Sequence, residues 1–233
     1  MPTRTCVITG ASRGIGLAAA LRFAQSGCNI VAAARHAPAL DDAVAQIRAA
    51  GAACEPVALD VARPADARRL IDHAVQCFGR LDVLVNNAGY AVLKPLDQMS
   101  PEEFDQTTAV NVAAVFHTTQ AAWPIMKAQR AGVIINVSSL SSIDPFPGFA
   151  VYGASKAWVN LFSQATGAEG RQFGIRVYAV APAAVETTML RSIAPDLPPE
   201  HTLAPAEVAA VITKLCDDDL APASGQTIFV RKS

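Results

Sequence analysis

Residues 5–28, TCVITGASRGIGLAAALRFAQSGC, combine three structural signals in one short stretch. Apolar and β-branched residues at 6–9 predict a short buried strand, glycines follow at 10, 14 and 16, and residues 17–23 open a helix that Gly27 ends. A strand, a glycine-rich loop and a helix in this order direct backbone N–H groups and the positive end of a helix dipole at a phosphate. The stretch therefore predicts a nucleotide-binding turn; the alternative is a glycine-rich turn in an α/β protein that binds no nucleotide.

Composition limits the class of protein. The 233 residues suffice for one large α/β domain, 52% are hydrophobic, 17% are charged, and the net charge of −1 includes no basic or acidic block. Nucleic acid and membrane surfaces are therefore poor partners. The five cysteines are widely spaced and form no Cys-x-x-Cys pair, and the four histidines lack metal-ligand spacing, so we expect reduced thiols and no metal. No signal peptide or membrane span fits, which predicts a cytoplasmic protein.

Strands and helices alternate along the chain. The expected strands are 6–9, 29–34, 54–59, 82–85, 132–137, 175–181 and 226–230, and the expected later helices are 38–50, 64–78, 100–130, 151–173 and 204–216. Ser100, Pro101 and Glu103 form a capping box at the start of the longest helix. Helical connections favour a parallel sheet with right-handed crossovers. We expect a single α/β domain over residues 1–233, with a doubly wound, seven-stranded, mainly parallel sheet and helices on both faces.

Four polar residues point to chemistry at one edge of this sheet. Tyr152 and Lys156 are four residues apart at the start of a helix, and therefore lie on one face. A nearby ammonium group favours the phenolate and lowers a phenol pKa from about 10. Ser139 ends a strand thirteen residues before Tyr152, and Asn111 lies inside the preceding helix. In a doubly wound sheet these places face one crevice, at the carboxyl ends of the strands.

The motifs together resemble those of the classical short-chain dehydrogenase/reductase family. Residues 9–16 have the form TGxxxGIG and residues 86–89 are NNAG, followed by the helical asparagine, the serine and YxxxK in the family's order. The resemblance extends over about residues 3–230. It implies a Rossmann-type domain that binds a nicotinamide cofactor, with a short substrate loop at about 188–204.

The resemblance also assigns roles in catalysis. Tyr152 would protonate the carbonyl oxygen of a ketone or aldehyde as hydride reaches its carbon, or act as the base in the reverse direction. Ser139 would donate a hydrogen bond to that oxygen. Lys156 would bind the nicotinamide-ribose hydroxyls and lower the pKa of Tyr152. Asn111 would hold a water that links Lys156 to solvent.

Cofactor-binding positions follow from the same resemblance. The pyrophosphate loop comprises Gly10, Ser12, Arg13, Gly14, Ile15 and Gly16. The positions near adenine and its ribose are Asp60, Val61, Asn87, Ala88 and Gly89. Pro182, Val185 and Thr187 follow strand six, and Tyr152 and Lys156 are also cofactor-binding positions. Ala183 departs from the family's Pro-Gly pair, so the turn there is expected to differ in shape. Residues 230–233 lack the Asp-Gly-Gly found in many members, which affects the expected tetramer contacts.

The second strand predicts which nicotinamide cofactor is used. An NAD enzyme places a carboxylate at the end of this strand to bind the ribose 2′-hydroxyl, yet residues 1–40 contain no Asp or Glu. Ala34 stands at that position, Arg35 and His36 follow, and Arg13 can reach the same place from the glycine loop. Two guanidinium groups suit a 2′-phosphate, which favours NADP(H) over NAD(H) and reduction as the direction. The alternative is that Arg35 is a solvated strand end.

The substrate is less well defined than the reaction. Apolar residues expected at the site suggest a mainly apolar small molecule with one carbonyl or alcohol group; they are Leu93, Pro145, Phe146, Phe149, Met189 and Leu190. One specific alternative is a 3-oxoacyl group on an acyl carrier protein, because Arg130 and Arg171 lie near the docking arginines of such reductases. An alternative of another class is a non-catalytic NADP(H)-binding sensor or scaffold. Helices 102–130 and 151–173 are apolar on more than one side, which predicts a homo-oligomer, a tetramer or a dimer.

Overall fold

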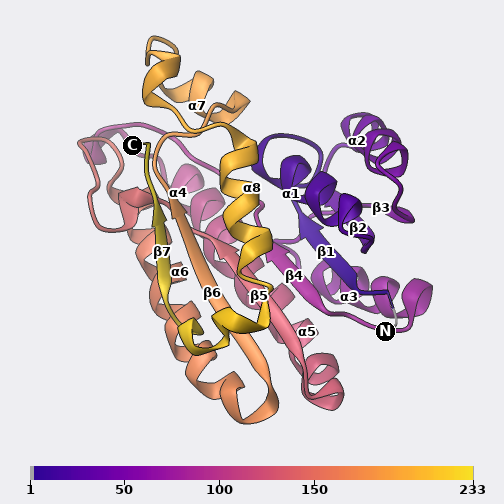
Figure 1. The fold of residues 1–233 in the computed structure, drawn as a ribbon. Helices are drawn as coiled ribbons and strands as arrows, with labels where there is room; N and C mark the ends of the chain where they lie inside the picture. The colour runs from indigo at the N-terminus through magenta and orange to yellow at the C-terminus, as the bar shows by residue number, and fades with distance from the viewer. Residues whose placement is uncertain (1–2, 233) are drawn as a thin grey trace.

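The computed structural model describes residues 3–232, in which seven strands form one sheet in the order β3-β2-β1-β4-β5-β6-β7 (Figure 1). The strands are β1 (Thr5–Thr9), β2 (Asn29–Ala34), β3 (Cys54–Ala58), β4 (Val83–Asn86), β5 (Gly132–Val137), β6 (Ile175–Pro182) and β7 (Thr227–Val230). Each neighbouring pair is parallel, so the predicted α/β class and doubly wound order are confirmed. The predictions for residues 1, 2 and 233 lie outside the described residues.

Helices cover both faces of the sheet. They are α1 (Gly14–Gln25), α2 (Ala37–Ala49), α3 (Pro64–Phe78), α4 (Pro101–Thr108), α5 (Ala114–Gln129), α6 (Ala150–Gly170), α7 (Thr188–Ile193) and α8 (Pro205–Lys214). Residues of α1, α2 and α8 pack in one core layer, and residues of α3 and α5 pack in the layer on the opposite face. Because both faces are covered, the central strands are buried throughout and lack polar alternation. No helix within 3–232 is long and apolar enough to cross a bilayer.

The strand order reverses between β1 and β4. From β1 the chain builds β2 and β3 on one side, and from β4 it builds β5, β6 and β7 on the other. Such a switch point opens a crevice at the carboxyl ends of the strands. In Figure 1, β1 begins at the opposite end of the sheet, and α7 lies beyond the carboxyl ends.

Two elements differ from the sequence-based expectation. The helix expected over 100–130 contains a π turn at Ala109–Ala113, between α4 and α5. The segment 188–204, expected as a loop, contains α7 and a 3₁₀ turn at Pro199–His201. The helix α7 forms because Thr187 caps it, its side-chain oxygen accepting a hydrogen bond from the backbone N–H of Leu190 at 3.2 Å. The predicted capping box of α4 is confirmed by hydrogen bonds in both directions between Ser100 and Glu103.

Candidate active site

The glycine loop between β1 and α1 presents backbone donors. Gly10 and Gly14 have φ angles of 66° and 57°, which favour glycine. A Cβ on Gly16 would lie 2.3 Å from the Gly10 carbonyl oxygen. The N-cap residue of α1, Arg13, makes no side-chain cap, and the first turn holds no acidic residue. The first-turn N–H groups therefore remain available to an anion, which fits a pyrophosphate.

Hydrogen bonds across the switch point hold this loop. The Thr9 side-chain oxygen accepts hydrogen bonds from the backbone N–H groups of Asn87 and Ala88, each at 3.0 Å. The Asn87 side-chain amide donates to the carbonyls of Thr9 and Gly10, at 3.0 and 3.1 Å. Asn87, predicted as a ribose-side residue, therefore also fixes the end of β1 to the end of β4. A Cβ on Gly10 would lie 2.9 Å from this amide nitrogen, so glycine is needed for the close approach.

The ends of β2 and β3 lie beside the same loop. The backbone N–H of Ala11 donates to Ala33 at 3.0 Å, and that of Leu59 donates to Ala34 at 3.0 Å. Arg35 follows directly and is exposed, as is Arg13 in the loop. Among the other residues predicted here, His36 is exposed at the N-cap of α2, Asp60 is half-buried and Val61 is buried. The structure thus brings the residues predicted to lie near adenine and its ribose to one edge of the crevice.

Tyr152, Lys156 and Ser139 come together where β5 meets α6. The Lys156 ammonium donates to the Val137 carbonyl at 2.8 Å and lies 5.8 Å from the Tyr152 ring centroid. The Ser138 hydroxyl donates to the Lys156 carbonyl at 3.0 Å, which fastens the end of β5 to α6. The Ser139 oxygen accepts from the Ser141 N–H at 3.2 Å, and this bond leaves its own proton free to donate.

Asn111 lies in the π turn and links three segments. Its side-chain oxygen accepts from the Tyr90 N–H at 2.9 Å, and its amide donates to the Tyr90 carbonyl at 2.9 Å and to the Ser155 hydroxyl at 3.0 Å. Ser155 donates in turn to the Tyr152 carbonyl at 2.6 Å. Sequence reasoning missed Tyr90 and Ser155, although one follows the NNAG motif and the other precedes Lys156. Asn111 therefore positions the helix that carries Tyr152.

Burial controls the protonation of both ionisable side chains. Desolvation lowers the pKa of Lys156 to about 8. Desolvation also raises the pKa of Tyr152, and a hydrogen bond with the Ser139 side chain opposes this rise. The expected lowering of the Tyr152 pKa by Lys156 is thus not found in this structure, because loss of water disfavours the phenolate. A tyrosine with a raised pKa holds its proton at neutral pH and is suited to donate it.

Aromatic side chains form a wall that leads to Tyr152. The ring centroids of Phe146 and Phe149 are 4.4 Å apart, and those of Phe149 and Tyr152 are 5.0 Å apart. Phe146 is exposed, and so is Leu93, which lies in the segment after β4 and approaches Gly148 in the segment before α6. An apolar surface therefore adjoins the ring of Tyr152.

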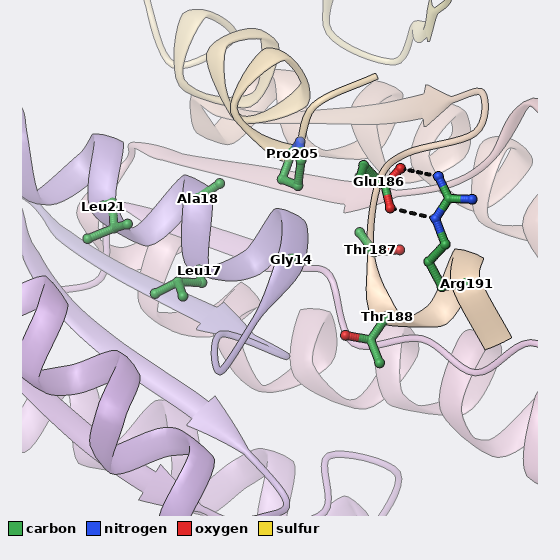
Figure 2. Close-up of a pocket in the computed structure, with 9 residues that line it drawn as sticks. All are labelled: Gly14, Leu17, Ala18, Leu21, Glu186, Thr187, Thr188, Arg191 and Pro205. Carbon is green, nitrogen blue, oxygen red and sulfur yellow. Dashed lines mark hydrogen bonds and ion pairs between the residues drawn. The ribbon is translucent and has the colours of Figure 1, made fainter. Parts of the chain in front are cut away.

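A cavity of about 580 Å³ lies between α1 and the segment that follows β6 (Figure 2). Gly14 and Thr187, both predicted to bind cofactor, line it, and Figure 2 shows the paired side chains of Glu186 and Arg191 at its rim. Among the nearby predicted residues, Pro182 ends β6 and Val185 pairs with Leu203 in an isolated bridge. Among the non-glycine residues within 3–232, only Arg130 has a positive φ, so Ala183 does not. The alanine therefore fits its turn without strain.

Arg130 and Arg171 lie away from this crevice. Arg130 caps the carboxyl end of α5, and Arg171 follows the carboxyl end of α6. The chain there enters the amino ends of β5 and β6, whereas Ser139 and Tyr152 lie at the carboxyl ends. Within one protomer the two arginines are therefore at the opposite end of the sheet from Tyr152.

Comparisons with known proteins agree on one family. Residues 4–198 match the family model described as short chain dehydrogenase. A 3-oxoacyl-[acyl-carrier-protein] reductase, FabG, from Thermotoga maritima is 37% identical over 97% of this chain and 96% of its own length. The 3beta-hydroxysteroid dehydrogenase 1 of Eggerthella lenta is 36% identical over 97% of this chain and 92% of its own. The crystal structure of a 3-ketoacyl-(acyl-carrier-protein) reductase from Brucella melitensis complexed with NADH superposes with a TM-score of 0.91 at 31% identity, covering 98% and 97% of the two chains.

Proposed function

Because the chain belongs to the short-chain dehydrogenase/reductase family, whose members are oxidoreductases that bind a nicotinamide cofactor, we propose that it reduces a ketone or aldehyde to an alcohol with NADPH. The observation that carries the proposal is the group formed by Tyr152, Lys156 and Ser139 at the carboxyl end of β5, beside an apolar surface. The proposed substrate is a mainly apolar small molecule with one carbonyl group.

The residues around the crevice fit a dinucleotide. Uncapped N–H groups at the start of α1 suit its pyrophosphate. Lys156 has three N–H donors and uses one on Val137, so two remain for ribose hydroxyls. When bound, the reduced nicotinamide supplies the hydride.

Side chains of the protein supply the proton and position the substrate oxygen. Tyr152 holds its proton at neutral pH and would donate it to the carbonyl oxygen. Ser139 would donate a hydrogen bond to the same oxygen and fix its position. Asn111, through Ser155 and the Tyr152 carbonyl, keeps the first turn of α6 in place during this step.

Tyr152→Phe tests the reaction because it removes the phenol hydroxyl and keeps the ring that packs on Phe149. We expect kcat/KM with a panel of apolar ketones to fall by about 10²–10⁴-fold, while NADPH binding, followed by nicotinamide fluorescence, stays within about threefold of wild type. Tyr90→Phe is the matched control and should retain turnover. A Tyr152→Phe variant with more than about a tenth of wild-type kcat/KM would contradict the role of Tyr152. A wild-type protein that binds NADPH but turns over no ketone would favour the sensor or scaffold alternative.

The preference for NADPH rests on Arg35 and Arg13. Both are exposed beside the end of β2, which is hydrogen-bonded to the glycine loop, and residues 1–40 contain no carboxylate. A hydrogen bond to a charged group contributes about 1.5–3 kcal/mol, so Arg35→Asp should lower kcat/KM for NADPH at least about tenfold and improve the use of NADH. Arg171→Asp, at the far end of the sheet, is the control. Equal use of both cofactors by wild type would refute the preference.

A carrier-linked 3-oxoacyl substrate is the second candidate, which the similarity to the FabG relative favours. Arg130 and Arg171 lie far from Tyr152 within one protomer, so they could guide a carrier to this site only from a neighbouring subunit. The test compares a 3-oxoacyl group on the carrier protein with the same group on a small thioester. A kcat/KM advantage for the carrier that Arg130→Glu or Arg171→Glu removes would support this candidate; equal rates would exclude it.

We also propose a homo-oligomer built on α4, α5 and α6. Phe104, Phe116 and Leu161 are 51%, 40% and 67% exposed. Trp158 stacks on Phe162 with ring centroids 4.6 Å apart, and Phe116 contacts the same Phe162 ring edge-on at 6.4 Å, which extends the apolar surface. Light scattering should give a molar mass that is a multiple of 24.3 kDa, and Leu161→Asp should lower this molar mass. A wild-type monomer at micromolar concentration would refute this proposal.

A further inference from the structure

Three side chains with metal-binding atoms meet at the outer edge of the sheet. His73 and Cys77 lie one turn apart on the same side of α3, and Glu55 lies on β3. Glu55 and Val57 point to the same face of the strand, and Val57 packs against the apolar layer that contains Leu70 of α3. Glu55 therefore faces the helix that carries the other two residues.

One of the distances between the donor atoms matches that around a tetrahedral ion, and a second lies close to it. The Cys77 sulfur lies 3.5 Å from His73 Nε2, and the same nitrogen lies 3.9 Å from a Glu55 carboxylate oxygen. All three donor atoms lie within 4.8 Å of one another. Zinc bonds of about 2.3 Å to sulfur and about 2.0–2.1 Å to nitrogen and oxygen place the S and N ligands about 3.6 Å apart and the N and O ligands about 3.4 Å apart. The sulfur and nitrogen are already at that spacing. The carboxylate oxygen needs to approach the nitrogen by about half an ångström, and it lies within 4.8 Å of the sulfur, which it must also approach.

The donor set identifies the class of ion. Imidazole and thiolate ligands favour zinc over magnesium and calcium, which prefer oxygen ligands alone. Glu55 supplies one carboxylate, and its side chain is 42% exposed while that of His73 is 34% exposed, so an ion can enter from solvent. The nearby cation Arg69, one turn before His73, pairs with Asp66 at 3.2 Å instead.

We propose that Glu55, His73 and Cys77 bind a zinc ion, with water as the fourth ligand. The site is distinct from the candidate active site, because Glu55 lies near the amino end of β3 whereas Asp60 and Val61 follow its carboxyl end. β3 is an edge strand that pairs only with β2 among the described strands. A bound ion would join this edge to α3 and stabilise it.

The expectation that the histidines lack metal-ligand spacing does not take Cys77 into account. The pair His73-x-x-x-Cys77 does have the spacing of two ligands on one helix face. Glu55 is eighteen residues earlier in the sequence, and only the fold brings it to this pair.

Cobalt(II) is the probe, because its thiolate complexes have a charge-transfer band in the near ultraviolet. Untagged, full-length protein stripped of metal with EDTA is titrated with Co²⁺, and zinc is then added to displace it. We expect one cobalt per chain and a thiolate band that zinc abolishes. Cys77→Ser should abolish the band, and His73→Ala and Glu55→Gln should each weaken binding at least about tenfold, which is about 1.4 kcal/mol.

Asp72→Asn and His117→Ala are the matched controls, since each removes a similar side chain outside the triad. They should retain the wild-type band and affinity. As a second readout, zinc should raise the unfolding temperature of wild type and the controls but not of Cys77→Ser. The proposal is overturned if cobalt binds without a thiolate band, if the triad variants bind as tightly as wild type, or if the controls lose binding equally.

Discussion

Replacing Lys156 with methionine should stabilise the protein and abolish its turnover. Lys156 is only 4% exposed, and burial lowers its pKa from the usual 10.5 to about 8. At about 1.4 kcal/mol per pH unit, holding this buried side chain charged at pH 7 costs about 3 kcal/mol. Methionine has a similar length and no charge, but it leaves the Val137 carbonyl without its hydrogen-bond donor. This loss costs about 1 kcal/mol and offsets part of the gain from removing the buried charge. The expected net gain for Lys156→Met is therefore about 2 kcal/mol.

The pH dependence of this gain distinguishes burial from other causes. The folded pKa lies below the unfolded one, so between about pH 8 and 10.5 the unfolded chain binds more protons than the folded chain. The stability of wild type therefore rises relative to Lys156→Met across this window. The advantage of the variant should be constant below about pH 8 and should fade as the pH approaches 10.5.

The assay is thermal and urea unfolding of the ligand-free protein at several pH values. A gain of about 2 kcal/mol corresponds to a rise of about 4–8 °C in unfolding temperature for a chain of this size. Lys127→Met, which changes an exposed lysine of α5, is the control and should give little change with pH. The reasoning is refuted if Lys156→Met is no more stable than wild type at pH 7, or if its advantage persists undiminished at pH 10.

Three other outcomes can be measured on the same material. The kcat/KM for NADPH in the reductive direction should fall as pH rises above about 8, because Lys156 loses its charge there while Tyr152 stays protonated; a flat profile to pH 9.5 would contradict this. Gly16→Ala should destabilise the chain by about 1–3 kcal/mol in urea, since the new methyl group meets the Gly10 carbonyl oxygen. Asn111→Leu should lower both stability and turnover, because the backbone N–H and carbonyl of Tyr90 both lose the Asn111 side chain as hydrogen-bond partner; unchanged stability would show that the π turn holds without these bonds.

Elements that depend on local pattern could be predicted from the sequence. Strands such as Gly132–Val137 are continuous apolar runs, and Ser100 with Glu103 defines a helix start by side-chain chemistry alone. The π turn at Ala109–Ala113 could not be predicted in this way. Its sequence, AVNVA, has no helix-breaking residue, and the turn coincides with the contacts of Asn111 to Tyr90 and Ser155. Those partners come from other parts of the chain.

The same distinction holds within the candidate site. The positions of Tyr152 and Lys156 follow from helical spacing, so the sequence identifies them as neighbours. The direction of the Tyr152 pKa shift depends on how much water the fold removes, which the spacing of Tyr152 and Lys156 along the helix does not encode. Glu55 likewise joins His73 only after β3 and α3 have packed. The spacing of residues along one helix thus predicts which side chains are neighbours, whereas the solvation of a side chain and the contacts between separate elements cannot be predicted from that spacing.

The site concentrates features that would destabilise an ordinary protein core. Lys156 is charged and buried, Gly10 and Gly14 hold positive φ angles, and a π turn interrupts the helix that carries Asn111. Each departs from a local rule. The first two leave donors available to a ligand, namely two N–H groups of Lys156 and the backbone N–H groups at the start of α1, and the π turn lets Asn111 hold the first turn of α6 in place through Ser155. The fully buried central strands supply the stability that offsets these features. A ligand that satisfies the free donors would remove part of the destabilisation, so binding and folding should be thermodynamically coupled at this crevice.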